Sequence, residues 1–288
     1  VIRRSITRFV EKDGNLILGN GVAMLNETLG DTTGSMGTNV KLMFDSLPDL
    51  YDLLTKGKYA VLGRYDPQIL NAIFGDRADT IPYLQRSQAE MAEKIAEQLT
   101  LMIPTKQGGG NGGEDPQFGL FAAAYLTKAA INNYGLKYYH TLVTDEPCHE
   151  YIDKNSLEHV FGNEVFEKVK ENTENDFTKK MPSMKEIVSA LKKQAHAFAI
   201  VLPHSEYNTI EYWTDLYGSE HVVQVDTTEY LPYIQATLIG LTEGVFGLND
   251  VPEYLKSVGL NQTEAKKIQR SVANIPIGAQ TQFENFAG

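Results

Sequence analysis

The apolar positions along this chain follow two patterns. Short continuous apolar runs predict buried strands, whereas apolar residues at helical spacing predict amphipathic helices. The expected strands cover residues 22–25, 58–64, 138–143, 198–202 and 221–225. The expected helices cover residues 39–54, 88–102, 118–132, 230–241 and most of 155–195, with short helices in 245–288. Because strands and helices alternate, we expect a doubly wound α/β fold, with a mainly parallel sheet and helices on both faces.

Three local features refine these elements. Pro48 should kink or break the helix over residues 39–54. The polar stretch at residues 26–30 should make the first strand end early or bulge before it reaches Asp31. Asp226 and Glu229 have the spacing of a capping box for the helix over residues 230–241.

Composition narrows the classes of function. The net charge of −11 at pH 7 disfavours binding to nucleic acid, because such a surface repels phosphate groups. The single cysteine, Cys148, excludes an internal disulfide and a cysteine-rich zinc site. The longest apolar runs are far too short to span a bilayer, and no signal peptide is visible. We therefore expect a cytoplasmic protein without membrane contact.

Three polar loops carry the candidate chemistry. The first contains Asp31, Thr33 and Ser35, the second covers residues 112–115, and the third contains Asp145 at the end of a predicted strand. In a doubly wound sheet, ligands bind beyond the carboxyl ends of the strands, where these loops are expected to meet. Carboxylates and hydroxyls form an all-oxygen site, which suits Mg²⁺, Ca²⁺ or Mn²⁺ and disfavours zinc or copper.

These loops resemble three motifs of von Willebrand factor A domains. Residues 31–37, Asp-Thr-Thr-Gly-Ser-Met-Gly, are similar to the Asp-x-Ser/Thr-x-Ser signature of the metal-ion-dependent adhesion site. Residues 112–115, Gly-Gly-Glu-Asp, resemble the Gly-Gly-x-Thr loop, with Asp115 in the place of the threonine. Residues 144–147, Thr-Asp-Glu-Pro, resemble the Thr-Asp-x-Pro loop, whose aspartate usually acts through water. The resemblance covers roughly residues 20 to 243.

The resemblance implies a domain over residues 21–243, with an N-terminal extension at 1–20 and a C-terminal helical extension at 244–288. It also implies a ligand set for Mg²⁺, with Ca²⁺ or Mn²⁺ as alternatives, that consists of Asp31, Thr33, Ser35, Asp115 and Asp145. Glu114 is the alternative to Asp115. Family members mostly bind proteins and are not enzymes, so the metal is expected to capture an acidic residue of a protein partner. The motifs look closest to intracellular bacterial and phage members, some of which accompany MoxR-type AAA+ ATPases.

Other functions remain open on the sequence. The domain could be a structural, assembly or virion component in which the metal holds loops together. A metal-assisted phosphoester hydrolase is less favoured, because the three loops contain no lysine or arginine to neutralise a phosphoryl group. The glycine run at 108–113 lacks the Gly-Lys-Ser/Thr ending of a phosphate-binding loop. Cys148 has no evident base beside it, His149 is interpreted as a hydrogen-bonded loop residue, and Trp213 as a packing residue.

Overall fold

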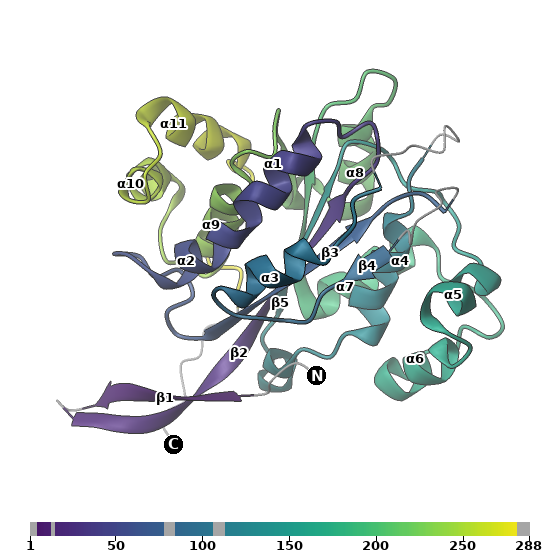
Figure 1. Cartoon of the computed structure of the whole chain (residues 1–288), viewed down its shortest axis with the longest axis horizontal. Coiled ribbons are helices and arrows are strands. Elements are labelled where there is room, and N and C mark those ends of the chain that lie inside the picture. Colours follow the sequence, from purple (N-terminus) through teal and green to yellow (C-terminus); the bar gives the residue numbers. More distant parts are fainter. Residues whose placement is uncertain (1–4, 13–14, 78–83, 106–112, 281–288) are drawn as a thin grey trace.

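A computed structural model of the chain describes residues 5–12, 15–77, 84–105 and 113–280. Its centre is a seven-stranded sheet (Figure 1). The strands are β1 (Ser5–Lys12), β2 (Asn15–Asp31), β3 (Asp66–Phe74), β4 (Leu84–Arg86), β5 (Tyr138–Thr144), β6 (Ala195–Val201) and β7 (Val222–Gln224).

The strands follow the order β4-β3-β2-β5-β6-β7, and β1 pairs with β2. Strands β2, β3, β5, β6 and β7 are parallel, whereas β4 is antiparallel to β3 and β1 is antiparallel to β2. The chain moves from β2 to β3 and β4, and then returns to β5 on the other side of β2. The doubly wound α/β fold predicted from the sequence is confirmed. The reversal of strand order at β2 makes the carboxyl end of this strand the expected ligand site.

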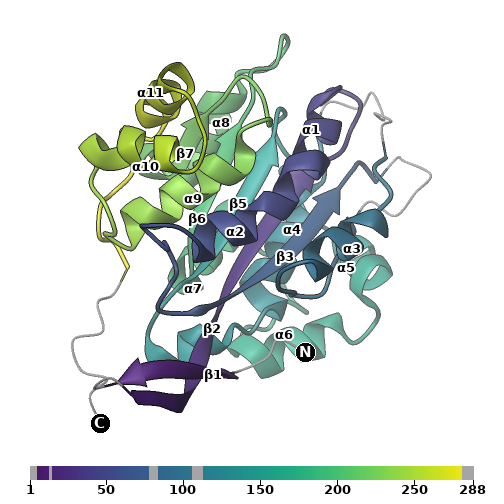
Figure 2. The same cartoon turned by 60° about the vertical axis from the view of Figure 1, so that its left-hand side comes forward.

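Strand β2 is long because it belongs to two pairings. Its first half, residues 15–22, pairs with β1, and its second half, residues 23–31, pairs with β3. The β1–β2 arm projects at the end of the sheet opposite the loop that precedes α1 (Figures 1 and 2). The expectation that residues 26–30 end the strand early is wrong. The buried polar side chains there have polar partners: Arg86 pairs with Glu27 at 2.7 Å, and Gln235 donates to Thr28 at 2.7 Å.

Two adjacent residues of β2 show how closely helices cover both faces of the sheet. A Cβ atom on Gly30 would lie 2.5 Å from Met43 Sδ of α1. On the opposite face, Leu29 lies against α4. A Cβ atom added to Gly119 of α4 would lie 2.5 Å from the δ carbons of Leu29. Because neighbouring residues of a strand point to opposite faces, α1 and α4 cover opposite sides of the sheet. Figure 2 shows α1, α2 and α9 together in front of the sheet.

The helices surround one continuous apolar core. They are α1 (Asn39–Ser46), α2 (Leu50–Thr55), α3 (Lys94–Thr100), α4 (Pro116–Phe121), α5 (Lys154–Phe161), α6 (Val165–Thr173), α7 (Met184–Gln194), α8 (Thr209–Tyr217), α9 (Leu231–Thr242), α10 (Val251–Ser257) and α11 (Gln262–Ser271). Within the described part of the chain, every helix is too short or too polar to cross a bilayer.

Several predicted elements need correction. Residues 58–64 form turns and not a strand, and the strand β3 begins two residues later, at Asp66. The predicted helix at 88–102 is limited to α3, and the one at 118–132 ends as a π-helical turn, η2 (Ala122–Leu126). The break at Pro48 is confirmed, since a 3₁₀ turn (Leu47–Asp49) separates α1 from α2. The expected helices in the tail are confirmed by α10 and α11.

The capping box predicted before α9 is wrong. The N-cap of α9 is Tyr230, and no side chain caps it. Asp226 instead pairs with Lys267 of α11 at 2.6 Å, so its carboxylate is directed to a neighbouring helix. Capping boxes do form elsewhere, at Ser183 with Glu186 and at Asn261 with Glu264, where the helices begin directly after the serine or asparagine.

Candidate metal centre

The carboxylate of Asp31 organises the loop that follows β2. It is fully buried. Its Oδ1 atom accepts hydrogen bonds from the backbone N–H of Thr33 at 2.9 Å and from the Thr33 hydroxyl at 2.6 Å. Its Oδ2 atom accepts a hydrogen bond from the hydroxyl of Thr144, the last residue of β5, at 2.9 Å. Asp31 therefore joins the carboxyl ends of two adjacent parallel strands.

Thr32 attaches the same loop to β3, the strand on the other side of β2 from β5. The backbone N–H and the hydroxyl of Thr32 both donate to the carbonyl oxygen of Phe74, at 3.0 and 2.9 Å. The hydroxyl of Thr105 donates to the Thr32 carbonyl at 2.9 Å. The loop is consequently held from β3 as well as from β5.

Ser35 extends the network to the third predicted loop. Its hydroxyl donates to Asp145 Oδ1 at 3.0 Å and lies 3.2 Å from the Thr33 hydroxyl. Asp145 follows β5, and its own carbonyl oxygen accepts a hydrogen bond from Thr209 of α8 at 2.8 Å. The structure thus brings Asp31, Thr33, Ser35 and Asp145 into one hydrogen-bonded chain, although 110 positions separate Ser35 from Asp145.

Glu114 lies beside this chain. Its backbone N–H donates to Pro147 O, and its carbonyl accepts from the His149 N–H, both at 3.1 Å. These bonds attach the second loop to the third. The Glu114 side chain is buried, and its Oε2 atom has no hydrogen-bond partner among the described residues. Its carboxyl group interacts with the hydroxyl of Thr33 and with the charge of Asp31, so it faces the predicted metal site.

Asp115, the residue predicted to complete the ligand set, is engaged by an arginine. The guanidinium of Arg77 donates to Asp115 Oδ1 from Nη2 at 2.6 Å and from Nε at 3.0 Å. The Arg77 backbone N–H donates to Oδ2 at 2.6 Å, and the Gln117 amide donates to Oδ1. Asp115 is fully buried, so this pairing compensates its charge. A metal at Asp115 would have to compete with Arg77, and the ligand role of Asp115 stays a prediction.

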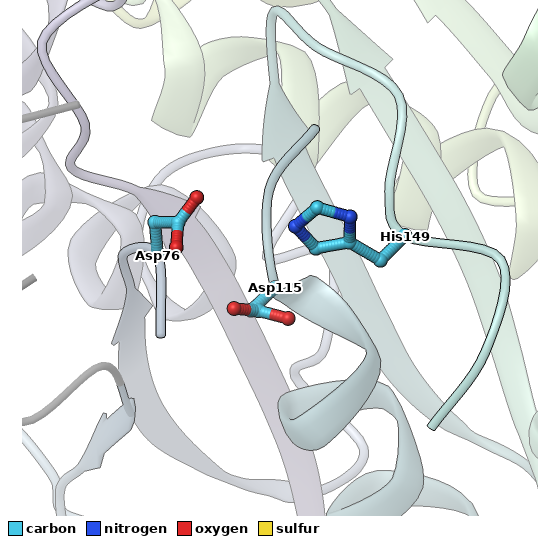
Figure 3. A group of neighbouring side chains, drawn as sticks. All are labelled: Asp76, Asp115 and His149. Carbon is cyan, nitrogen blue, oxygen red and sulfur yellow. The ribbon is translucent and has the colours of Figure 1, made fainter. Parts of the chain in front are cut away.

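A second group of potential ligands surrounds Asp115. Single ligand atoms of Asp76, Asp115 and His149 lie within 4.8 Å of one another. Figure 3 shows the three side chains around a common space. The ring of His149 packs against Gly113, where a Cβ atom would lie 3.4 Å from Nδ1 and where φ is +138°. Since Arg77 already satisfies Asp115, this group is a less favourable metal site than the one at Asp31.

Burial makes the carboxylates around Asp31 reluctant to ionise. Burial, followed by the charge of Asp145, raises the pKa of Asp31 to about 7. Burial, followed by the charges of Asp31, Glu146 and Asp76, raises the pKa of Glu114 to about 10. Burial also raises the pKa of Asp145, against the opposing effects of Ser35 and His204. The largest effects that raise the pKa of Asp31 and Glu114 are burial and the charges of neighbouring carboxylates.

The donor set fits a hard divalent cation. Carboxylate and hydroxyl oxygens converge from three loops, and these are the ligands that Mg²⁺, Ca²⁺ and Mn²⁺ prefer. A cation would remove the repulsion that raises the pKa of Asp31 and would give the orphaned Oε2 atom of Glu114 a partner. The site therefore matches the class of metal predicted from the sequence, while the identity of the ion stays a prediction.

The residues with competing interpretations can now be placed. Cys148 is buried against Tyr212, 2.9 Å from its hydroxyl, and burial raises the pKa of the thiol to about 12. A nucleophilic role near neutral pH is thereby disfavoured. Trp213 is fully buried and donates to the Glu146 carbonyl at 3.0 Å, which confirms its packing role beneath the third loop. Residues 108–112 of the glycine run lie outside the described residues.

Sequence reasoning missed two charged residues at the site. Glu146 belongs to the third loop, where its carboxylate lies 3.6 Å from His204 Nε2, and its position beside Asp145 was a usable signal. Arg77 follows β3, a strand that the apolar pattern did not reveal, so nothing in the sequence connected it with Asp115.

Comparison with known proteins gives distant structural similarity only. The sequence matches no protein-family model and no curated protein. Proximal thread matrix protein 1 from the mussel byssus, solved with a zinc-occupied MIDAS motif, is 15% identical with a TM-score of 0.47, over 77% of this chain and 46% of that chain. The open conformation of the pilus adhesin SpaC from Lactobacillus rhamnosus GG is 16% identical with a TM-score of 0.46, over 82% of this chain and 33% of that chain. The chain thus spans about half the length of the first protein and a third of the second.

Proposed function

We propose that this chain is a metal-dependent protein-binding module, and not an enzyme, whose site captures an acidic residue of a partner protein. The observation that carries the proposal is the hydrogen-bonded network of Asp31, Thr33, Ser35 and Asp145 at the carboxyl ends of β2 and β5. This network places the carboxylate of Asp31 close enough to that of Asp145 for the charge of Asp145, after burial, to raise the pKa of Asp31.

The residues of the network would have different roles in binding a Mg²⁺-type cation. Asp31 and Asp145 supply negative charge, whereas Thr33 and Ser35 supply neutral oxygens that leave part of the ion's charge uncompensated. Thr32 and Thr144 hold the loops in register from β3 and β5. A bound divalent cation would supply a coordination position for a carboxylate oxygen of the partner. Ca²⁺ and Mn²⁺ satisfy the same donor set and are the alternatives.

Some parts of the proposal rest on the sequence resemblance alone. These are a bacterial or phage origin, a cytoplasmic location and a MoxR-type AAA+ ATPase as the partner. Any partner of the proposed kind must present an aspartate or glutamate on a protruding segment, because the site lies in the loops at the edge of the sheet.

Calorimetric titration of Mg²⁺, Ca²⁺ and Mn²⁺ into metal-free protein tests the metal site directly. We expect one saturable site in the wild type and none in Asp31→Ala. Asp45→Ala, which removes an exposed carboxylate from α1, is the matched control and should bind like the wild type. Circular dichroism would verify that both variants are folded. Unchanged metal affinity in a folded Asp31→Ala protein would rule out this site.

A structural role is the second candidate, because the network joins segments that are distant in the sequence. Asp31 bonds to Thr144, Ser35 bonds to Asp145, and Glu114 bonds to the loop at 147–149. A metal there would hold three loops together, as an assembly or virion component would require. Metal-dependent thermal stability without metal-dependent binding of any acidic protein would favour this role. A phosphoester hydrolase is less well supported, since the guanidinium of Arg77 is engaged by Asp115.

A further inference from the structure

The carboxylate of Glu114 differs from those of Asp31 and Asp145 in one respect: its buried Oε2 atom forms no hydrogen bond with the described residues. Both oxygens of Asp31 accept hydrogen bonds, and Oδ1 of Asp145 accepts one from Ser35. The Oε2 atom of Glu114 has none among the described residues, although the residue is only 4% exposed. The group is nevertheless directed at the site, because it interacts with the Thr33 hydroxyl and with the charge of Asp31. A buried carboxylate in this position is poised to bind a cation.

Hydrogen bonds hold the backbone of Glu114 in place beside the site. Two hydrogen bonds of 3.1 Å attach it to Pro147 and His149, in the loop that follows Asp145. The next residue, Asp115, is held by the backbone N–H and the guanidinium of Arg77. Movement of Glu114 toward or away from a bound ion is therefore a matter of side-chain rotation, which needs no rearrangement of the loops.

Charge balance shows why such rotation matters for a partner. Five carboxylates interact electrostatically around this site, and when ionised they outweigh the two charges of one divalent cation: Asp31, Asp76, Glu114, Asp145 and Glu146. An additional carboxylate from a partner would enter an environment that is already negative, at a cost that a buried site does not screen well. Displacement of one internal carboxylate from the ion would offset the negative charge that an acidic residue of a partner brings.

We propose that Glu114 is an internal ligand, which takes the position of the partner's carboxylate in the partner-free protein and must be displaced for binding. This inference rests on the proposed function. It adds a residue that competes with the partner's carboxylate and thereby lowers the affinity for the partner. It assigns different roles to the two adjacent acids: Glu114 contacts the ion, and Asp115 holds the loop through Arg77.

The test uses acetate as a carboxylate probe with Mg²⁺-saturated protein, and compares wild type, Glu114→Gln and Glu146→Gln. Both substitutions remove one negative charge, but only the first removes the proposed internal ligand. We expect Glu114→Gln to bind Mg²⁺ more weakly than the wild type and to bind acetate at least about tenfold more tightly once saturated with Mg²⁺. Glu146→Gln should change both affinities much less, because it removes a neighbouring charge but not the proposed ligand. Calorimetry measures the Mg²⁺ affinity, and line broadening of ¹³C-labelled acetate measures the binding of the probe.

The outcomes separate the two proposals. Wild-type protein that binds no Mg²⁺ would overturn the proposed function and the internal ligand together. Wild type that binds Mg²⁺, with no gain of acetate binding in Glu114→Gln, would overturn the internal ligand alone. An equal gain in Glu146→Gln would also overturn it, because total charge would then explain the effect. Glu114→Asp, which keeps the charge and shortens the side chain, should give an intermediate gain and provides the same test if the glutamine variant does not fold.

Discussion

Replacing Asp31 by asparagine should stabilise the metal-free protein at pH 8, although the residue lies at the centre of the site. The side chain is fully buried, and burial with the charge of Asp145 raises its pKa from the ordinary value of 3.8 to about 7. This rise corresponds to about 4 kcal/mol of unfavourable free energy for the ionised form. Asparagine has nearly the same shape, can accept the two hydrogen bonds from Thr33, and carries no charge. We therefore expect Asp31→Asn to raise the free energy of unfolding by about 2–4 kcal/mol in the absence of metal.

The stability that Asp31→Asn gains over the wild type depends on pH. Folded Asp31 keeps its proton to a higher pH than unfolded Asp31, so the wild type loses stability as the pH rises from about 4 to about 7. The asparagine variant does not lose stability in this way, because its side chain carries no titrating proton. The difference between the two proteins should consequently be small near pH 4, increase through this window, and become constant above about pH 8.

Urea unfolding monitored by Trp213 fluorescence measures this effect. Trp213 is the single tryptophan, is fully buried, and is hydrogen-bonded to the loop of Asp145. With chelator present, the midpoint of Asp31→Asn should exceed that of the wild type at pH 8. With Mg²⁺ at a hundredfold excess over Kd, the wild type alone should gain about 2.7 kcal/mol. A variant less stable than the wild type at pH 8 without metal would refute the reasoning, because Asp31 would then be a net stabilising residue.

Three further predictions concern the surroundings of the site. The Mg²⁺ affinity of the wild type should rise between pH 6 and pH 8, because Asp31 must ionise to bind the ion. The rise should be up to about tenfold per pH unit for each proton released. Calorimetry in two buffers counts these protons, and an affinity independent of pH would contradict the expectation. Arg77→Ala should lower the free energy of unfolding by about 2–4 kcal/mol, since it leaves Asp115 buried and unpaired, and Asp115→Asn in the same background should recover part of the loss in urea unfolding. Gly119→Ala should cost about 1–3 kcal/mol, because the new methyl group meets the δ carbons of Leu29 at 2.5 Å; an unchanged melting temperature would show that the contact between α4 and β2 can relax.

The fold was predictable where strands are short apolar runs, and it was missed where polar residues lie in the sheet. Strands β5, β6 and β7 coincide with predicted runs within a few residues. Strand β3 contains Gln68 and Asn71, both buried, and these polar side chains removed the apolar signal. The stretch at 58–64 has strand-like composition but forms turns, because the chain must turn before it enters β3. Tertiary burial, which the pattern does not encode, determined the outcome in both places.

Part of the site could be derived from spacing and topology. Alternate oxygens at Asp31, Thr33 and Ser35 follow one strand end, and Asp145 follows a strand that a doubly wound sheet places next to it. The hydrogen bond from Ser35 to Asp145 shows that these predicted positions meet. Their convergence needs only the strand order, so a correct fold class was sufficient.

The choice between Glu114 and Asp115 could not be derived in this way, because it depends on a single position of register. Residues 114 and 115 are adjacent, so their side chains leave the backbone in different directions, and a shift of one residue would exchange their roles. Two features absent from the motif favour Glu114. The hydrogen bonds of Glu114 with Pro147 and His149 fix the direction of the backbone, and the guanidinium of Arg77 engages the carboxylate of Asp115. Since Arg77 comes from the loop after the unpredicted strand β3, the choice of Glu114 as the proposed ligand depends on a contact that only the folded chain creates.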